Sequence, residues 1–291
     1  MFESNNFLSM HKVTWLLVFV LFSGCMSDRQ ELHTDIKANE NIDMSAANKE
    51  IAHSFYKRVI GQLDEAFVDS IIADDYIQHN PMVKTGKAGI LEAIAYLKQM
   101  PRPENPKSPI VRSFAEGDFV VLHLNVNMGP SSRAVIDLFR IENGIMVEHW
   151  DVMENNAGTM TDGTIVMDIE VESAESKQLL ASYYDEVVIG GNLESLPNYV
   201  EGSVIQHDPL VKDGIVSLKA YLEDDATSVR IEKVHRLIAE HDYVVAQLEG
   251  VFNGLPHAVY DIARVENGKI AEQWRVKQAI PGQMMHNNGM F

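Results

Sequence analysis

The feature that most constrains the fold of this 291-residue chain is a long internal repeat. Residues 134–152 read AVIDLFRIENGIMVEHWDV and residues 258–276 read AVYDIARVENGKIAEQWRV, with ten of nineteen positions identical. Earlier in each copy, YIQHN at 76–80 corresponds to VIQHD at 204–208. The offset falls from 128 to 124 residues across the segment PRPENPKSP, which the second copy lacks. Two units of about 110 residues are therefore expected, not a solenoid of short repeats.

Each unit begins with helical periodicity and ends with strand-like runs. Ile51, Phe55 and Val59 recur every four residues in the first copy, as an amphipathic helix requires. A second, short helix is expected near 63–72, and a third follows the IQH segment. Four strands are expected at 110–116, 119–128, 133–142 and 145–153, and an Asn-Gly turn separates the last two. Helices followed by an antiparallel sheet predict an α+β fold.

The first 25 residues resemble the signal of a bacterial lipoprotein. Residues 13–22 read VTWLLVFVLF, which is too short to span a bilayer, since a spanning helix needs about 20 apolar residues. This run follows Lys12 and leads into LFSGC, which resembles a lipobox and ends at Cys25, the only cysteine. We expect Cys25 to be lipidated and to anchor the chain in the bacterial cell envelope, on the periplasmic or outer-membrane side. The alternative is a plain signal peptide and a secreted protein.

These observations predict the order of segments along the chain: a signal peptide at 1–24, a flexible tether at 25–47, a first domain at 48–155, a linker at 156–175, a second domain at 176–281 and a tail at 282–291. The formal charge of −18 argues against a nucleic-acid partner, because such a chain repels phosphate backbones. A single cysteine excludes an internal disulfide framework and a Cys-rich zinc site.

Both copies resemble the SnoaL-like polyketide cyclases of the nuclear-transport-factor-like superfamily. The resemblance rests on the IQH-Asn/Asp-Pro segment and on the later Asp-x-x-Arg-x-Glu-Asn-Gly-x-x-x-Glu-x-Trp pattern, each present twice. It implies two tandem cone-shaped domains, each with three helices packed on a curved antiparallel sheet around an apolar cavity. Domains of this superfamily often pair through the outer sheet face, so an internal pseudo-dimer is expected. The cyclases close a ring by aldol condensation and use no cofactor.

Asp137 is the first candidate for chemistry, because alternation along its strand places it with Val135, Phe139 and Ile141. A carboxylate on an apolar face is costly unless it is paired or functional, and burial makes it a better base. The resemblance implies that Asp137 is the catalytic acid–base residue and that His123 is the histidine beside it. The alternatives are a structural aspartate and an exposed strand histidine. The second copy has Gln247 in place of His123, so any catalysis is expected in the first copy.

The remaining candidates lie at the turn and on the last strand of each copy. His79 and His207 precede the turn and reach into the cone mouth or merely pack the turn. Trp150 and Glu148 are expected to point inward and to bind the ligand, whereas the opposite face with His149 and Asp151 reads as exposed; core packing is the alternative for the tryptophans. The candidate catalytic residues are Asp137, His123 and His79, and the candidate ligand-binding residues are Trp150, Glu148, His207, Asp261 and Trp274.

No metal or other cofactor is expected. There is no His-x-x-x-His pair, and a site built from His79, His123 and Asp137 is the weaker alternative. Nucleotide-binding and serine-hydrolase motifs are also absent from the sequence. The function that the sequence favours is binding of a small, mainly apolar molecule by a lipid-anchored protein, with aldol-cyclase or isomerase-type acid–base catalysis in the first domain. The alternative is a non-catalytic envelope protein that binds a ligand or partner.

Overall fold

The computed structural model describes residues 44–101, 107–128, 131–155, 157–224 and 226–291. The signal segment, Cys25 and most of the tether lie outside these ranges. The chain divides into two compact units, of which the second, Ile42–Phe291, contains all the described residues. Within the described residues, no helix has the length and apolar character needed to cross a membrane.

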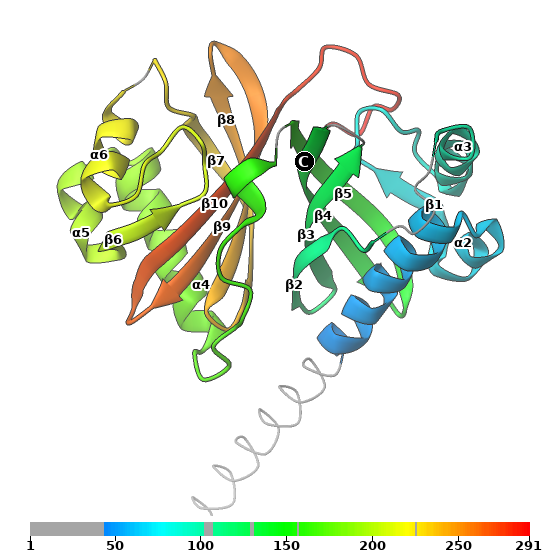
Figure 1. Cartoon of the computed structure of the whole chain (residues 1–291), viewed down its shortest axis with the longest axis horizontal. Coiled ribbons are helices and arrows are strands. Elements are labelled where there is room, and N and C mark those ends of the chain that lie inside the picture. Colours follow the sequence, from blue (N-terminus) through cyan, green and yellow to red (C-terminus); the bar gives the residue numbers. More distant parts are fainter. Residues whose placement is uncertain (1–43, 102–106, 129–130, 156, 225) are drawn as a thin grey trace, which may run out of the picture. The chain divides into compact units, whose positions relative to one another are not determined.

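Two sets of helices and strands follow one another along the described chain (Figure 1). In the first half, a helix over residues 44–54 continues as the π-helix η1 (Phe55–Ile60). It is followed by α2 (Glu65–Ile71), β1 (Ile72–Gln78), α3 (Lys87–Leu97), β2 (Ile110–Glu116), β3 (Phe119–Met128), β4 (Ser131–Glu142) and β5 (Ile145–Asn155).

The second half repeats this order after the short 3-10 helix η2 (Gly158–Thr161). Its elements are α4 (Ser173–Ser182), η3 (Tyr183–Ile189), η4 (Leu193–Ser195), α5 (Leu196–Tyr199), β6 (Val200–Gln206), α6 (Ile215–Glu223), β7 (Arg230–Glu240), β8 (Tyr243–Phe252), β9 (Leu255–Glu266) and β10 (Lys269–Ala279).

Each half contains one five-stranded mixed sheet. The strand order is β1-β5-β4-β3-β2 in the first sheet and β6-β10-β9-β8-β7 in the second. Neighbouring strands are antiparallel except that β1 pairs with β5, and β6 with β10, in parallel. The expectation of a wholly antiparallel sheet was therefore wrong. The IQH segment forms a fifth strand at the sheet edge, and the long connection to β5 lets the two strands run in the same direction.

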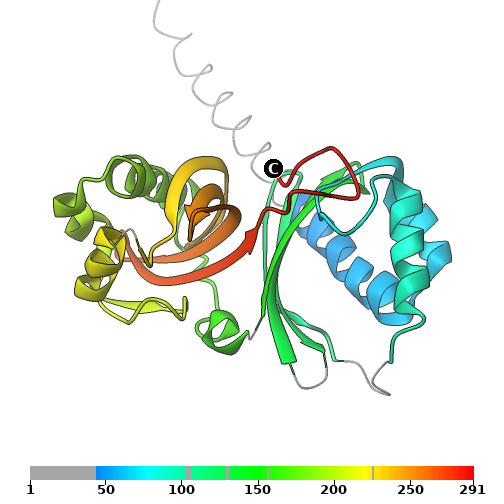
Figure 2. The same ribbon diagram turned by 90° about the horizontal axis from the view of Figure 1, so that it is seen from above.

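The two faces of each sheet are buried in different cores. One face packs on the helices of its own half, as Figure 2 shows, and there Phe139 and Ile141 join a core with Phe55 and Val59. The opposite faces share a core to which both sheets contribute, including Ile136 and Trp150 from the first and Tyr260 and Trp274 from the second. Since both faces are apolar, alternation alone does not tell which face meets the helices.

A β-bulge in β5 decides the orientation of its side chains. Arg140 pairs with Glu148 while the next residue, Ile141, pairs with Met146, so one residue of β5 is extra. A bulge of this kind reverses the alternation beyond it. Met146 therefore lies in the helix-covered core, but Trp150 lies in the shared core. The expected inward orientation of Trp150 and Glu148 was wrong, and β10 contains the same irregularity before Glu272.

The C-terminal segment beyond β10 returns to the first half (Figure 2). The backbone amide of Met285 donates to the carbonyl of Pro81 at 2.9 Å, and the Asn288 amide group donates to the carbonyl of Gln78 at 2.9 Å. His286 lies 2.8 Å from the carbonyl of Asn80. The expected tail at 282–291 is thus held against the turn after β1.

Candidate active site

Three titratable side chains meet on the helix-covered face of the first sheet. Asp137 on β4 lies directly opposite Asp151 on β5, and His149 lies one pleat away on the same face. All three residues are buried, and one ligand-type atom of each lies within 4.8 Å of the other two. Like charges directly opposite each other on a sheet are destabilising. The repulsion between Asp137 and Asp151 therefore favours a proton on one of the two carboxylates.

A neighbouring side chain fixes each member of this cluster. The Tyr56 hydroxyl donates to Asp137, and the Asn80 side-chain amide donates to Asp151 Oδ2 at 2.6 Å. His149 Nδ1 lies 2.9 Å from Gln78 Oε1, which also accepts from the Asn80 backbone amide at 2.8 Å. Because an amide oxygen only accepts, Nδ1 carries a proton. Nε2 is therefore left to face Asp137 Oδ1, 3.6 Å away.

The electrostatics of the cluster change the proton affinity of its members. Burial, together with the nearby Asp137 carboxylate, raises the pKa of Asp151 to about 6 against the opposing effects of His149 and Asn80. Burial alone would lower the pKa of His149, but its interaction with Asp137 raises it above the ordinary value. Burial and the Asp137 charge raise the pKa of Tyr56 well above its usual range. The cluster thus contains groups that change protonation near neutral pH.

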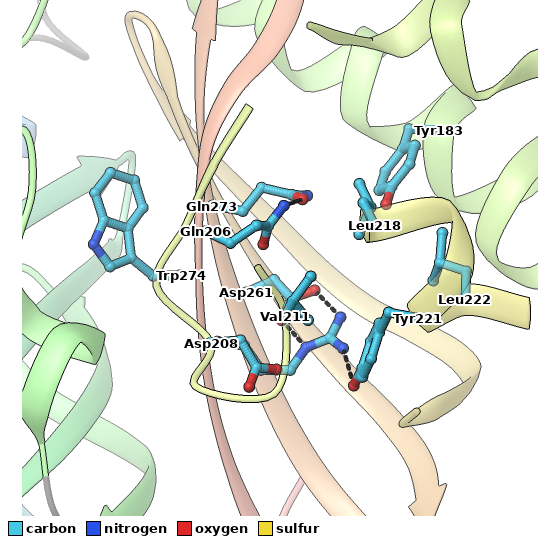
Figure 3. Close-up of a pocket in the computed structure, with 11 residues that line it drawn as sticks. Tyr183, Gln206, Asp208, Val211, Leu218, Tyr221, Leu222, Asp261, Gln273 and Trp274 are labelled. Carbon is cyan, nitrogen blue, oxygen red and sulfur yellow. Dashed lines mark hydrogen bonds and ion pairs between the residues drawn. The ribbon is translucent and has the colours of Figure 1, made fainter. Parts of the chain in front are cut away.

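The second half has a different arrangement at the matching positions (Figure 3). Asp261 on β9 lies opposite Arg275 on β10, and two hydrogen bonds of 2.7 and 2.6 Å join the guanidinium to the carboxylate. The Tyr184 hydroxyl donates to Asp261 at 2.8 Å. Gln273 occupies the position of His149. The cavity beside this ion pair has a volume of about 20 Å³, which is room for about one water molecule and not for an organic ligand.

His123 does not join Asp137. It shares a face with Val121, as the alternation predicted, but that face lies in the shared core, while its neighbour across β4 is Ile136. Its Nδ1 lies 3.3 Å from Arg112, and burial, with the Arg112 charge, lowers its pKa to about 3. The expectation that His123 and Asp137 face one cavity was wrong, because adjacent strands place them on opposite faces of the sheet.

The remaining predicted residues form two matching groups at the shared core. His79 stacks on Trp150 at 4.9 Å and lies 2.9 Å from Glu148, while His207 stacks on Trp274 at 4.8 Å. His207 Nε2 lies 2.8 Å from Glu272. Figure 3 shows Trp274 pointing away from Asp261. The structure therefore brings His79, Glu148 and Trp150 together, and His207 with Trp274, but on the face opposite to Asp137 and Asp261.

Several members of the first-half site were not predicted from the sequence. His149 and Asp151 were expected to be exposed because their side chains are polar, and Trp150 was therefore given the inward face. Gln78 and Asn80 lie in the IQHN segment, which the second copy repeats as IQHD. Only the parallel pairing of β1 with β5 brings them to the cluster. Tyr56 lies between two residues of the predicted amphipathic stripe and carried no separate signal.

Part of the first half is similar to a known family of domains. Residues 52–149 match the family model described as SnoaL-like domain. The range holds Tyr56, Gln78, Asn80, Asp137 and His149, and it ends two residues before Asp151.

Several solved structures are similar to about a third of the chain. The structure of TsrD from Streptomyces laurentii is 18% identical and covers 37% of this chain and 91% of its own, with a TM-score of 0.31. A SnoaL-like polyketide cyclase from Agrobacterium tumefaciens is 15% identical over 35% and 91%, with a TM-score of 0.31. An LEH-like epoxide hydrolase from M. tuberculosis is 12% identical over 36% and 84%, with a TM-score of 0.30. No curated protein matches the chain.

Proposed function

We propose that the first half is an acid–base catalyst that acts on a small, mainly apolar carbonyl compound at the cluster of Asp137, His149 and Asp151. The observation that carries the proposal is the buried pair of facing carboxylates, in which the pKa of Asp151 is raised to about 6. Titratable groups that share a site but differ in their environments are suited to act as base and acid. His123 and His79, assigned catalytic roles from the sequence, are not part of this proposal.

In the proposed reaction, Asp137 removes a proton next to the carbonyl group. Its second oxygen is held by Tyr56, so the attacking oxygen is positioned before the substrate arrives. Protonated Asp151 or His149 then donates a proton to the developing enolate or alkoxide. Such proton transfers contribute about 10²- to 10⁴-fold to a rate. In an isomerisation, a proton returns to another carbon of the enolate. In an intramolecular aldol closure, the enolate carbon attacks a second carbonyl group of the substrate, and the alkoxide formed there takes the proton.

The second half is proposed to be a second SnoaL-like domain that supports the first without turnover. Its matching carboxylate is neutralised by Arg275 and is therefore not available as a base. The identical strand order and the shared core support the proposal that the two cones form an internal pseudo-dimer.

A probe reaction tests the proposed base without knowledge of the substrate. 5-Nitrobenzisoxazole loses its ring proton to a carboxylate while its N–O bond breaks, and the phenolate released is coloured. Asp137→Asn should slow this reaction at least about 100-fold. The matched control is Asp208→Asn, which removes a buried carboxylate from the second half and should leave the rate unchanged. Equal rates in Asp137→Asn and the wild type would contradict the proposal.

The lipid anchor at Cys25 is proposed on the signal-like segment alone, since these residues lie outside the described ranges. The wild type should partition into the detergent phase of Triton X-114 and incorporate labelled palmitate in a bacterial host. Cys25→Ala should lose the label or block processing. A wild type that stays in the aqueous phase without label would contradict the anchor.

A further inference from the structure

The cluster in the first half presents several electron-rich atoms to one another. Among the described side chains, Asp151 Oδ1, His149 Nε2 and the Tyr76 hydroxyl oxygen have no hydrogen-bond partner, although all three atoms are buried. Tyr76 is fully buried, and burial and the charges of Asp137 and Asp151 raise the pKa of its hydroxyl well above the usual range. The Tyr76 hydroxyl therefore keeps its proton, and the unpaired acceptors are Asp151 Oδ1 and His149 Nε2. Two such acceptors beside Asp137 favour a positive species between them.

We propose that Asp137, His149 and Asp151 bind a divalent transition-metal ion of the Zn²⁺ type. An imidazole and two carboxylates are suitable ligands for such an ion. Two ligands about 2.1 Å from a tetrahedral ion lie about 3.4 Å apart. The separation of His149 Nε2 and Asp137 Oδ1 is 3.6 Å, and the three ligand atoms lie within 4.8 Å of one another. Shifts of about 1 Å would complete the geometry.

The groups around these ligands match what a metal site requires. Metal-bound histidines donate their second ring N–H to a neighbouring oxygen, which fixes the tautomer. Gln78 Oε1 receives the Nδ1 proton of His149, so the lone pair of Nε2 is directed at the carboxylates. Tyr56 and Asn80 hold the second oxygens of Asp137 and Asp151. Each ligand therefore has one atom fixed by a neighbour and one atom directed toward the common centre.

The second half supplies an internal contrast, because Gln273 and Arg275 replace His149 and Asp151 there. An arginine cannot ligate a cation, and it already neutralises Asp261. One ion per chain is therefore expected. A bound ion would occupy the same three side chains that carry the proposed proton transfer, so the inference adds a regulation of that same site. It rests on the geometry of the cluster and not on turnover, so direct binding tests it separately from the proposed catalysis.

Isothermal titration of the untagged full chain with Zn²⁺, after removal of metals with a chelator, tests the proposal. The wild type should bind one ion, and Asp151→Asn and His149→Gln should each weaken binding at least about tenfold. His235→Gln is the control, because His235 is a half-buried histidine paired with Glu249 outside the cluster. Asp151→Asn is nearly isosteric, so it should fold even if His149→Gln does not.

Two further measurements sharpen the result. Co²⁺ bound to nitrogen and oxygen ligands should give a visible absorption band in the wild type and in His235→Gln, and none in Asp151→Asn. Zn²⁺ affinity should increase from pH 6 to pH 8, because imidazole and carboxylate groups bind a metal ion only in their deprotonated forms. No binding, unchanged binding in both ligand variants, or binding lost only in His235→Gln would overturn the proposal.

Discussion

Replacing Asp151 by asparagine should stabilise the protein at pH 8, although the residue is buried and hydrogen-bonded. Folding raises the pKa of Asp151 from an ordinary 3.8 to about 6, mainly through burial. One pKa unit corresponds to about 1.4 kcal/mol, so ionising Asp151 in the folded protein costs about 3 kcal/mol at pH 8. An asparagine side chain at this position would avoid this cost and still accept the hydrogen bond from Asn80. The expected gain in the free energy of unfolding is therefore up to about 3 kcal/mol.

The pH dependence gives the sign of the effect. A carboxyl group whose pKa is raised by folding stabilises the protein below its ordinary pKa, and this contribution is lost as the pH rises through about 6. The advantage of Asp151→Asn should fall from about 3 kcal/mol at pH 8 to about half of that at pH 5. Urea unfolding followed by tryptophan fluorescence measures it, since Trp150 and Trp274 are both buried in the shared core.

The matched substitution in the second half should have the opposite sign. Asp261→Asn leaves the buried guanidinium of Arg275 without its carboxylate, and breaking a buried ion pair costs about 3–5 kcal/mol. One chain thus contains two buried aspartates whose replacement by asparagine should act in opposite directions, one stabilising and one destabilising. A loss of stability in Asp151→Asn at pH 8, or a gain that does not shrink toward pH 5, would refute the assignment of Asp151 as a buried carboxyl with a raised pKa.

Three further predictions concern the shared core and the tail. His123→Gln should make the protein less sensitive to acid. The pKa of His123 is lowered to about 3, so below pH 6.5 this histidine binds a proton in the unfolded chain but not in the folded protein. Relative to the wild type, the free energy of unfolding of the variant in urea should be about 2 kcal/mol higher at pH 5 than at pH 8. Arg236→Met should lower the urea midpoint by an equivalent of about 2 kcal/mol, because the guanidinium lies 4.3 Å over Trp150 and donates to Gln247. Asn288→Ala should raise hydrogen exchange at the turn after β1 by removing a bond to the Gln78 carbonyl.

The sequence was informative where local patterns decide the structure. The Asn-Gly turns and alternating runs predicted β2, β3, β4 and β5 closely, and the apolar neighbours of Asp137 indicated its helix-covered face correctly. The orientation of the side chains of β5 was not predictable. The bulge before Glu148 reverses the alternation of side chains between the two faces, and no sequence pattern predicts this bulge.

The orientation of His123 was predicted wrongly for a different reason. Its strand neighbours were assigned correctly, but a sheet with two apolar faces gives no sign of which face meets the helices. The site depended equally on the parallel pairing of β1 with β5, a contact between segments about 70 residues apart. Local periodicity does not specify such a pairing. The repeat drew attention to the segment with Gln78 and Asn80, but their contact with His149 and Asp151 could not be predicted.

The C-terminal segment after β10 is linked to the first-half site through a chain of hydrogen bonds. Asn288 and His286 bind the carbonyls of Gln78 and Asn80, whose side chains in turn hold His149 and Asp151. Any coupling of binding free energies along this route acts equally in both directions. Binding of an ion at the cluster should therefore slow carboxypeptidase trimming of the segment after β10, and removal of that segment should weaken binding at the cluster.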